Sequence, residues 1–133
     1  MQGSRRSAGL RLLAAVACVF CSAVATAQPW PSKPIRIIVP YPAGGTSDIL
    51  ARALGPGITA ALGQPVIVEN KPGSTGNVGA EMVAKSPPDG YTLLLADIGS
   101  LAIGPSIFPA LPFDPVKDFA PVIMVAYSPH LLA

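Results

Sequence analysis

Short apolar runs alternate with segments of helical periodicity over most of the chain, and this alternation predicts the fold. The apolar runs predict strands at Ile35–Val39, Val66–Glu69, Thr92–Ala96 and Val122–Ala126, and a fifth strand at Leu131–Ala133. Mainly apolar runs of four or five residues are typical of strands buried on both faces. Apolar residues at helical spacing predict helices from about Ser47, over Val78–Lys85 and around Leu101–Ile107. Strands that alternate with helices predict a mainly parallel α/β sheet flanked by helices.

The first predicted helix contains an internal Gly55-Pro56-Gly57 sequence. Proline removes one backbone hydrogen bond and clashes with the preceding turn, so we expect a break or a kink at this point. The remaining turn, Ile58–Leu62, is expected to end at Gly63, because glycine is favoured directly after a helix.

Three loops rich in small residues each follow a predicted strand. They are Tyr41–Ser47, Asn70–Asn77 and Asp97–Ser100. Ligands of open parallel sheets bind outside the carboxyl ends of the strands, so we expect these loops to converge on one site. In the first loop, Ala43-Gly44-Gly45 leaves backbone N–H groups uncovered beside a helix start, where anions bind well. The alternative is that Gly44-Gly45 is a tight turn required by geometry alone. No lysine follows the glycines, so a phosphate P-loop is disfavoured.

Structural roles compete with ligand binding at most of these positions. Asp48 is better explained as a first-turn carboxylate that stabilises the helix dipole. Asn77 is better explained as the N-cap of the second helix. Ser74 and Thr75 are equally explained as turn formers. Tyr41 could pack against the lead-in Gln28–Pro34 instead of a ligand.

Residues 1–27 predict a cleaved export signal. Arg5, Arg6 and Arg11 precede the apolar run Leu12–Ala25, and Ala25-Thr26-Ala27 offers small residues for cleavage. A membrane anchor is the alternative, but the run is shorter than a bilayer span. Acylation at Cys18 is a second alternative, although no leucine precedes Ala15-Val16-Ala17.

Cleavage at this point changes both the charge and the available chemistry. Six basic residues then stand against seven acids, a net charge of −1 instead of the +2 of the whole chain. Clustered basic residues are absent, so nucleic-acid binding is disfavoured. Both cysteines leave with the signal and the one histidine, His130, lies near the end, which disfavours Ser–His or Cys–His catalysis. Metal-ligand spacing is also absent, and no cofactor is predicted.

Several longer motifs resemble one family. They are PSKPIRIIVPYPAGGTSDILAR, LGQPVIVENKPGSTGNVGAEMVAKSPPDGYTLLLA and LPFDPVKDFAPV, which together cover most of the chain from about Pro31. They resemble the N-terminal lobe of the Bug or TctC family, the periplasmic substrate-binding proteins of tripartite tricarboxylate transporters. The resemblance implies a type II periplasmic-binding-protein fold that closes over a small carboxylate, with residues 28–133 as part of the first lobe and the second lobe absent. It also implies a periplasmic location, transporter membrane components as partners and no enzymatic activity.

The resemblance further implies which residues face the ligand. The carboxylate cradle would be formed by Tyr41, Pro42, Ala43, Gly44, Gly45 and Thr46, with a hydroxyl from Ser47 and a bracing role for Asp48. The other two loops would contribute Ser74, Thr75, Gly76, Asn77, Ile98, Gly99 and Ser100. Asp97 stands where the family usually has threonine or serine, and its carboxylate would repel an anion. Two alternatives to transport stay open, a nonfunctional fragment and a sensor that reports ligand to a signalling partner.

Overall fold

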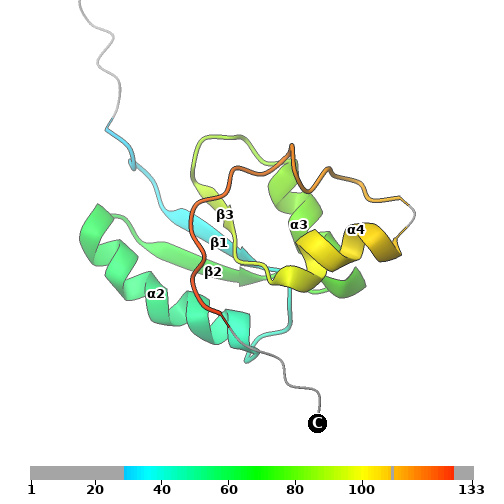
Figure 1. The fold of residues 1–133 in the computed structure, drawn as a ribbon. Helices are drawn as coiled ribbons and strands as arrows, with labels where there is room; N and C mark the ends of the chain where they lie inside the picture. Colours follow the sequence, from blue (N-terminus) through cyan, green and yellow to red (C-terminus); the bar gives the residue numbers. More distant parts are fainter. Residues whose placement is uncertain (1–28, 109, 128–133) are drawn as a thin grey trace, which may run out of the picture. The chain divides into compact units, whose positions relative to one another are not determined.

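The computed structural model describes residues 29–108 and 110–127, and its centre is a three-stranded parallel sheet (Figure 1). The strands are β1 (Ile35–Val39), β2 (Val66–Asn70) and β3 (Thr92–Leu94), in the order β2-β1-β3. Val39 pairs with Asn70 and Ile38 pairs with Leu94, so all three strands end at one edge of the sheet. The predicted parallel α/β sheet is therefore confirmed, with β3 two residues shorter than expected.

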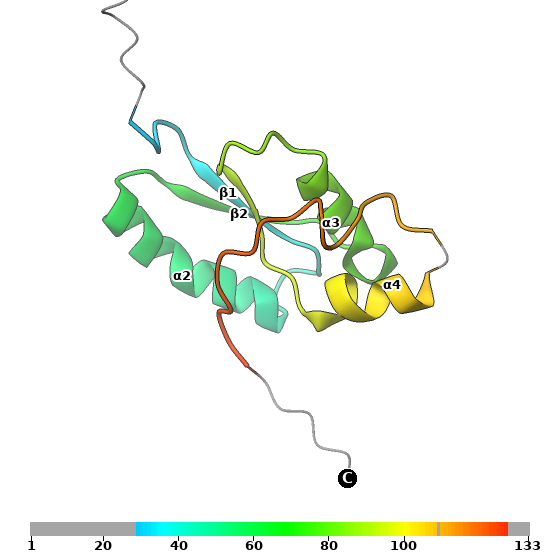
Figure 2. The ribbon, with the colours of Figure 1, turned by 45° about the horizontal axis from the view of Figure 1, so that its top comes forward.

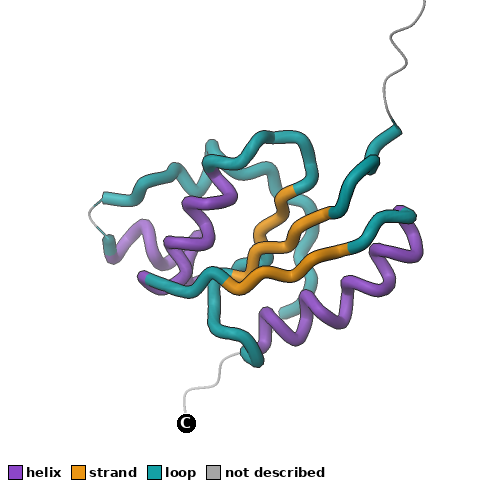
Figure 3. Tube along the Cα trace, turned by 180° about the vertical axis from the view of Figure 1, so that it is seen from behind, coloured by secondary structure: helices purple, strands orange, loops and turns teal. Residues whose placement is uncertain are grey.

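The helical elements connect the strands and follow the last one. They are α2 (Thr46–Leu62), the 3₁₀ turn η2 (Ser74–Gly76), α3 (Asn77–Ala84), the π-helical turn η3 (Gly99–Ile103) and α4 (Gly104–Ile107). In Figures 1, 2 and 3, α2 lies to one side of the strands, and α3 and α4 lie to the other.

The central strand β1 is buried on both faces, as its apolar sequence predicts. Ile37 and Val39 pack with Ala51 of α2 in the main core cluster. On the opposite face, α3 approaches so closely that a Cβ added at Gly79 would lie 2.7 Å from the Cβ of Pro40. A sheet covered on both faces exposes only its edges and its ends, and the loops at the carboxyl end are where a site can form.

Helix α2 runs without interruption through Pro56, so the expected break at Gly55-Pro56-Gly57 is wrong. Proline removes only the hydrogen bond to the carbonyl of Arg52, and packing on β2 compensates for that loss. Gly55 is buried there, and a Cβ on it would lie 3.8 Å from Val66. The expected C-cap is confirmed, because Gly63 has φ 70° and donates its N–H to the Thr59 carbonyl at 2.9 Å.

The strand expected at Val122–Ala126 is also wrong. This segment is irregular, and Val122, Ile123 and Met124 are about four-fifths exposed. A strand needs a neighbour that accepts its backbone hydrogen bonds, and this segment pairs with none of the described strands. The expected strand at Leu131–Ala133 and the expected signal over residues 1–27 lie outside the described residues. Among the helices described, none is both long and apolar enough to cross a membrane.

Candidate functional site

The three small-residue loops meet beyond the carboxyl ends of the strands, as predicted. Gly76, from the loop after β2, is buried between the other two loops. A Cβ added to Gly76 would lie 3.2 Å from the hydroxyl oxygen of Tyr41 and 3.1 Å from the Cβ of Ser100. The Tyr41 hydroxyl in turn donates a hydrogen bond to Oδ1 of Asp97. These contacts join the ends of all three strands in one cluster.

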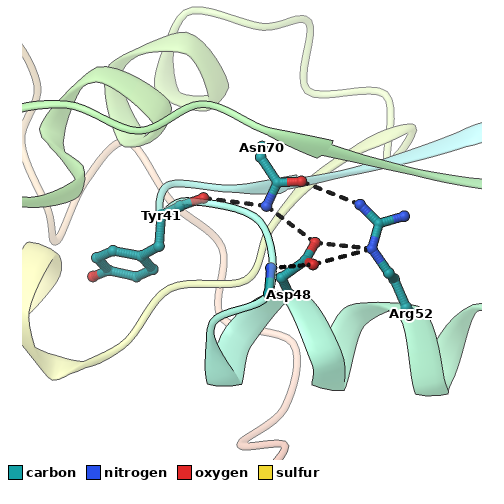
Figure 4. A network of polar contacts seen from close by, with 5 residues as sticks. Tyr41, Asp48, Arg52 and Asn70 are labelled. Carbon is teal, nitrogen blue, oxygen red and sulfur yellow. Dashed lines mark hydrogen bonds and ion pairs between the residues drawn. The ribbon is translucent and has the colours of Figure 1, made fainter.

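A polar network fixes the first loop against the end of β2 (Figure 4). The carboxylate of Asp48, at the start of α2, accepts the Gly44 N–H at 2.9 Å and Nε of Arg52 at 3.0 Å. Asn70 donates its amide to Oδ1 of Asp48 at 3.0 Å and to the carbonyl of Tyr41 at 3.1 Å. Its own side-chain oxygen accepts Nη2 of Arg52 at 3.2 Å. The loop conformation is therefore set by hydrogen bonds inside the protein.

The Asp48 carboxylate is stabilised in its charged form by these partners. Its side chain is 5% exposed, and the Arg52 hydrogen bond, followed by the Gly44 N–H, lowers the pKa of Asp48 to about 2. All four interactions with Gly44, Arg52 and Asn70 point to a bracing role. A buried, fully paired carboxylate is an unsuitable group for contacting an anionic ligand.

The expectation that Gly44 and Gly45 leave their backbone N–H groups uncovered is wrong, and the open backbone donors lie further along the chain. Gly44 donates to Asp48, and Gly45 donates to the Pro42 carbonyl at 3.4 Å, so both N–H groups have partners inside the loop. The next three N–H groups, of Thr46, Ser47 and Asp48, make no hydrogen bond within the described residues. They belong to the first turn of a 17-residue helix, where the macrodipole favours negative charge.

The second loop holds a buried acceptor without a partner. Asn77 is 7% exposed, and its Oδ1 has no hydrogen-bond partner in the part of the chain that the structure describes. The N-cap prediction for Asn77 is wrong, because Gly76 occupies that position and no side chain caps the helix. Glycine is found there because its φ is 93°, which ordinary side chains rarely adopt. Ser74 and Thr75 also have positive φ, at 47° and 57°, and both are exposed.

The third loop continues into a helical turn, because its last two residues, Gly99 and Ser100, begin η3. Oδ1 of Asp97 accepts the Gly99 N–H at 2.8 Å in addition to the Tyr41 hydroxyl. Ser100 is fully buried, and its hydroxyl lies 3.5 Å from the Asp97 carbonyl. Burial raises the pKa of Tyr41, and the hydrogen bond to Asp97 raises it further. Tyr41 therefore stays a neutral donor at physiological pH.

The predicted site residues separate into an exposed rim and a buried base. Those on the rim are Pro42, Ala43, Gly44, Gly45, Thr46, Ser74, Thr75 and Ile98. Those in the base, buried or half-buried, are Tyr41, Ser47, Asp48, Gly76, Asn77, Gly99 and Ser100. The sequence reasoning missed the structural roles of Arg52 and Asn70. The Asp48–Arg52 spacing of four residues was an available signal for the ion pair, whereas Asn70 had none. No cluster of three or more metal-ligating side chains occurs among the described residues.

Residues 50–133 match the TctC family, described as the tripartite tricarboxylate transporter family receptor. The chain belongs to this family. BugT of Bordetella pertussis, a relative, is 42% identical over 127 residues, which cover 92% of this chain and 39% of BugT. The chain thus spans 32–39% of the length of the curated relatives it matches. The TctC family is a family of transporter receptors and not of enzymes, as the resemblance implied.

Two solved structures confirm the fold expected of a TctC chain. MatC from Rhodopseudomonas palustris, with bound malate, is 36% identical with a TM-score of 0.67, covering 70% of this chain and 32% of MatC. A second R. palustris protein, solved with adipate, is 37% identical with a TM-score of 0.69, covering 71% of this chain and 32% of that protein. The predicted α/β lobe therefore corresponds to part of a periplasmic binding protein.

Proposed function

We propose that this chain is part of an extracytoplasmic solute-binding protein that captures a small organic carboxylate for a tripartite tricarboxylate-type transporter. Residues 1–27 direct export and are removed near Ala27, and residues 28–133 belong to the N-terminal lobe. Membership of the TctC family and the malate and adipate in its relatives support this function. The membrane components of the transporter are then the protein partners.

The observation that carries the proposal is the first turn of α2. Its three N–H groups, which make no hydrogen bond within the described residues, follow a loop that the Asp48 network holds in place (Figure 4). A carboxylate oxygen can accept two or three such donors, which are the usual anion ligands at a helix start. The half-buried Ser47 adds a hydroxyl in the same turn.

The charges around the site favour a carboxylate over a phosphate. Arg52, one turn after Asp48 in α2, is engaged with Asp48 and Asn70. Lys71 pairs with Glu69 at 3.7 Å. An anion at the start of α2 is thus bound by neutral N–H and hydroxyl donors, and such a site suits a single negative charge better than the double charge of a phosphate.

A proline substitution tests the helix start directly. Thr46→Pro removes one open N–H, while proline is well tolerated at the first helical position. Gly45 has φ −76° and ψ 169°, the conformation that a residue before proline prefers, so the fold should be retained. Thr46→Ala is the matched control, because it removes the side chain and keeps the N–H.

The measurement is the thermal stability of the complete gene product with and without malate, adipate and other carboxylates. We expect a carboxylate to raise the melting temperature of the wild-type protein and of Thr46→Ala. Thr46→Pro should melt normally without ligand and bind about 10-fold more weakly, since a hydrogen bond to a charged group contributes about 1.5–3 kcal/mol. Equal affinities in Thr46→Pro and Thr46→Ala, or no response to any carboxylate, would refute the proposal.

A further inference from the structure

We infer that Asp97 is a specificity-determining residue, which makes this site select carboxylates that also carry a hydrogen-bond donor over those that carry a second carboxylate. The donor can be an amide, a hydroxyl or an ammonium group. The inference rests on the proposed function, and it adds the chemical class of the ligand's other end.

The geometry fixes the Asp97 carboxylate at the mouth of the site. Its Oδ1 is held by the Gly99 N–H at 2.8 Å and by the Tyr41 hydroxyl. Its Oδ2 accepts no hydrogen bond within the described residues, and the residue is exposed. An ionised carboxylate is an acceptor only, so Oδ2 offers a fixed, open position for a donor.

Asp97 forms no ion pair with any basic residue that the structure describes. The six basic residues in the described part of the chain each form an ion pair with an acid other than Asp97, and two of them share Glu69. The pairs are Lys33–Asp89, Arg36–Glu69, Arg52–Asp48, Lys71–Glu69, Lys85–Glu81 and Lys117–Asp114. The negative charge of Asp97 therefore acts on whatever occupies the site.

The loop that holds Asp97 also lies within reach of a small ligand bound at α2. Strands β1 and β3 are neighbours in the sheet, so their following loops leave it about 5 Å apart. Tyr41 bridges them, since it follows β1 and donates to Asp97 after β3. A ligand carboxylate at the start of α2 places the other end of a short molecule toward Asp97. A second carboxylate there meets repulsion, whereas an N–H or O–H donor gains a charge-assisted hydrogen bond.

Pairs of acids that differ only in one group provide the test. Adipate and its monoamide, and malate and its monoamide, have nearly the same shape, but each monoamide replaces one carboxylate with a donor. Affinities are measured by calorimetry on the complete gene product, on Asp97→Asn and on Asp89→Asn. Asparagine keeps an oxygen for Gly99 and Tyr41, so Asp97→Asn removes the charge with little change in shape. Asp89→Asn removes the same charge from the turn before β3, at the opposite edge of the sheet.

We expect the wild-type protein and Asp89→Asn to bind at least one monoamide about 10-fold more tightly than its diacid. Asp97→Asn should lose this preference, mainly through tighter binding of the diacid. An unchanged preference in Asp97→Asn, or a wild-type preference for the diacids, would overturn the inference and leave the proposed function intact. Failure of all four compounds and of the wider carboxylate panel would overturn both.

Discussion

Gly76 is the residue where all three loops touch, and its replacement by alanine is the most direct test of the site's construction. A Cβ there would lie 3.1 Å from the Cβ of Ser100 and 3.2 Å from the hydroxyl oxygen of Tyr41. Both distances are shorter than ordinary van der Waals contacts. The alanine must also adopt φ 93°, which is unfavourable for any residue with a side chain.

Two energetic costs, one of backbone conformation and one of packing, determine how much stability Gly76→Ala loses. A left-handed backbone conformation costs an ordinary residue about 1–2 kcal/mol. Adding a methyl group to a tightly packed position costs about 1–3 kcal/mol. We therefore expect Gly76→Ala to lower the free energy of unfolding by about 2–5 kcal/mol. The added methyl group should also displace the Tyr41 hydroxyl from Asp97 and weaken carboxylate binding.

Urea unfolding of the complete gene product measures the stability change, and calorimetry measures the affinity. Gly57→Ala is the matched control, because it lies inside α2 and its added Cβ would meet no atom within 4 Å. Alanine is the better helix former, so Gly57→Ala should stabilise the protein by about 0.5–1 kcal/mol and leave binding unchanged. A Gly76→Ala protein within 0.5 kcal/mol of the wild type would show that the loops do not pack as described.

Two further predictions concern the polar network at the first loop. Asn70→Ala removes hydrogen bonds to Tyr41, Asp48 and Arg52, so we expect a loss of about 3 kcal/mol in the free energy of unfolding in urea, at about 1 kcal/mol per bond. An unchanged midpoint would contradict the network. The pKa of Asp48 is lowered from 3.8 to about 2, so its contribution is complete above pH 3.8 and is lost as the pH falls toward 2. We therefore expect the urea midpoint of the wild-type protein, measured between pH 2 and 6, to decrease as the pH falls from 3.8 toward 2. The midpoint of Asp48→Asn should depend less on pH in this range. Parallel curves for the two proteins would contradict the assigned role of Asp48.

Local sequence patterns were sufficient for much of the fold and for the convergence of the three loops. The apolar run of β1, the glycine that ends α2 and the three loops after strands each depend on a few adjacent residues. The convergence of those loops followed from a general property of parallel sheets. These features needed no knowledge of which distant residues meet.

Features that depend on distant contacts were missed or wrong. Helix α2 continues through Pro56 because it packs on β2, and packing is invisible in the local sequence. Val122–Ala126 has the composition of a strand, but a strand forms only where a partner is available. Asn70 donates a hydrogen bond to Asp48, which lies 22 positions away in sequence, and no local pattern predicts that contact.

The Asp48–Asn70 network has a consequence for the kinetics of capture. Because the protein's own side chains hold the first loop in its binding geometry, an arriving ligand need not fold a disordered segment at the moment of encounter. The entropy of ordering that loop is lost once, during folding, and does not weaken each binding event. Association at this lobe should then be limited by diffusion and by the movement of whatever encloses the ligand, and the lifetime of the complex will determine the affinity.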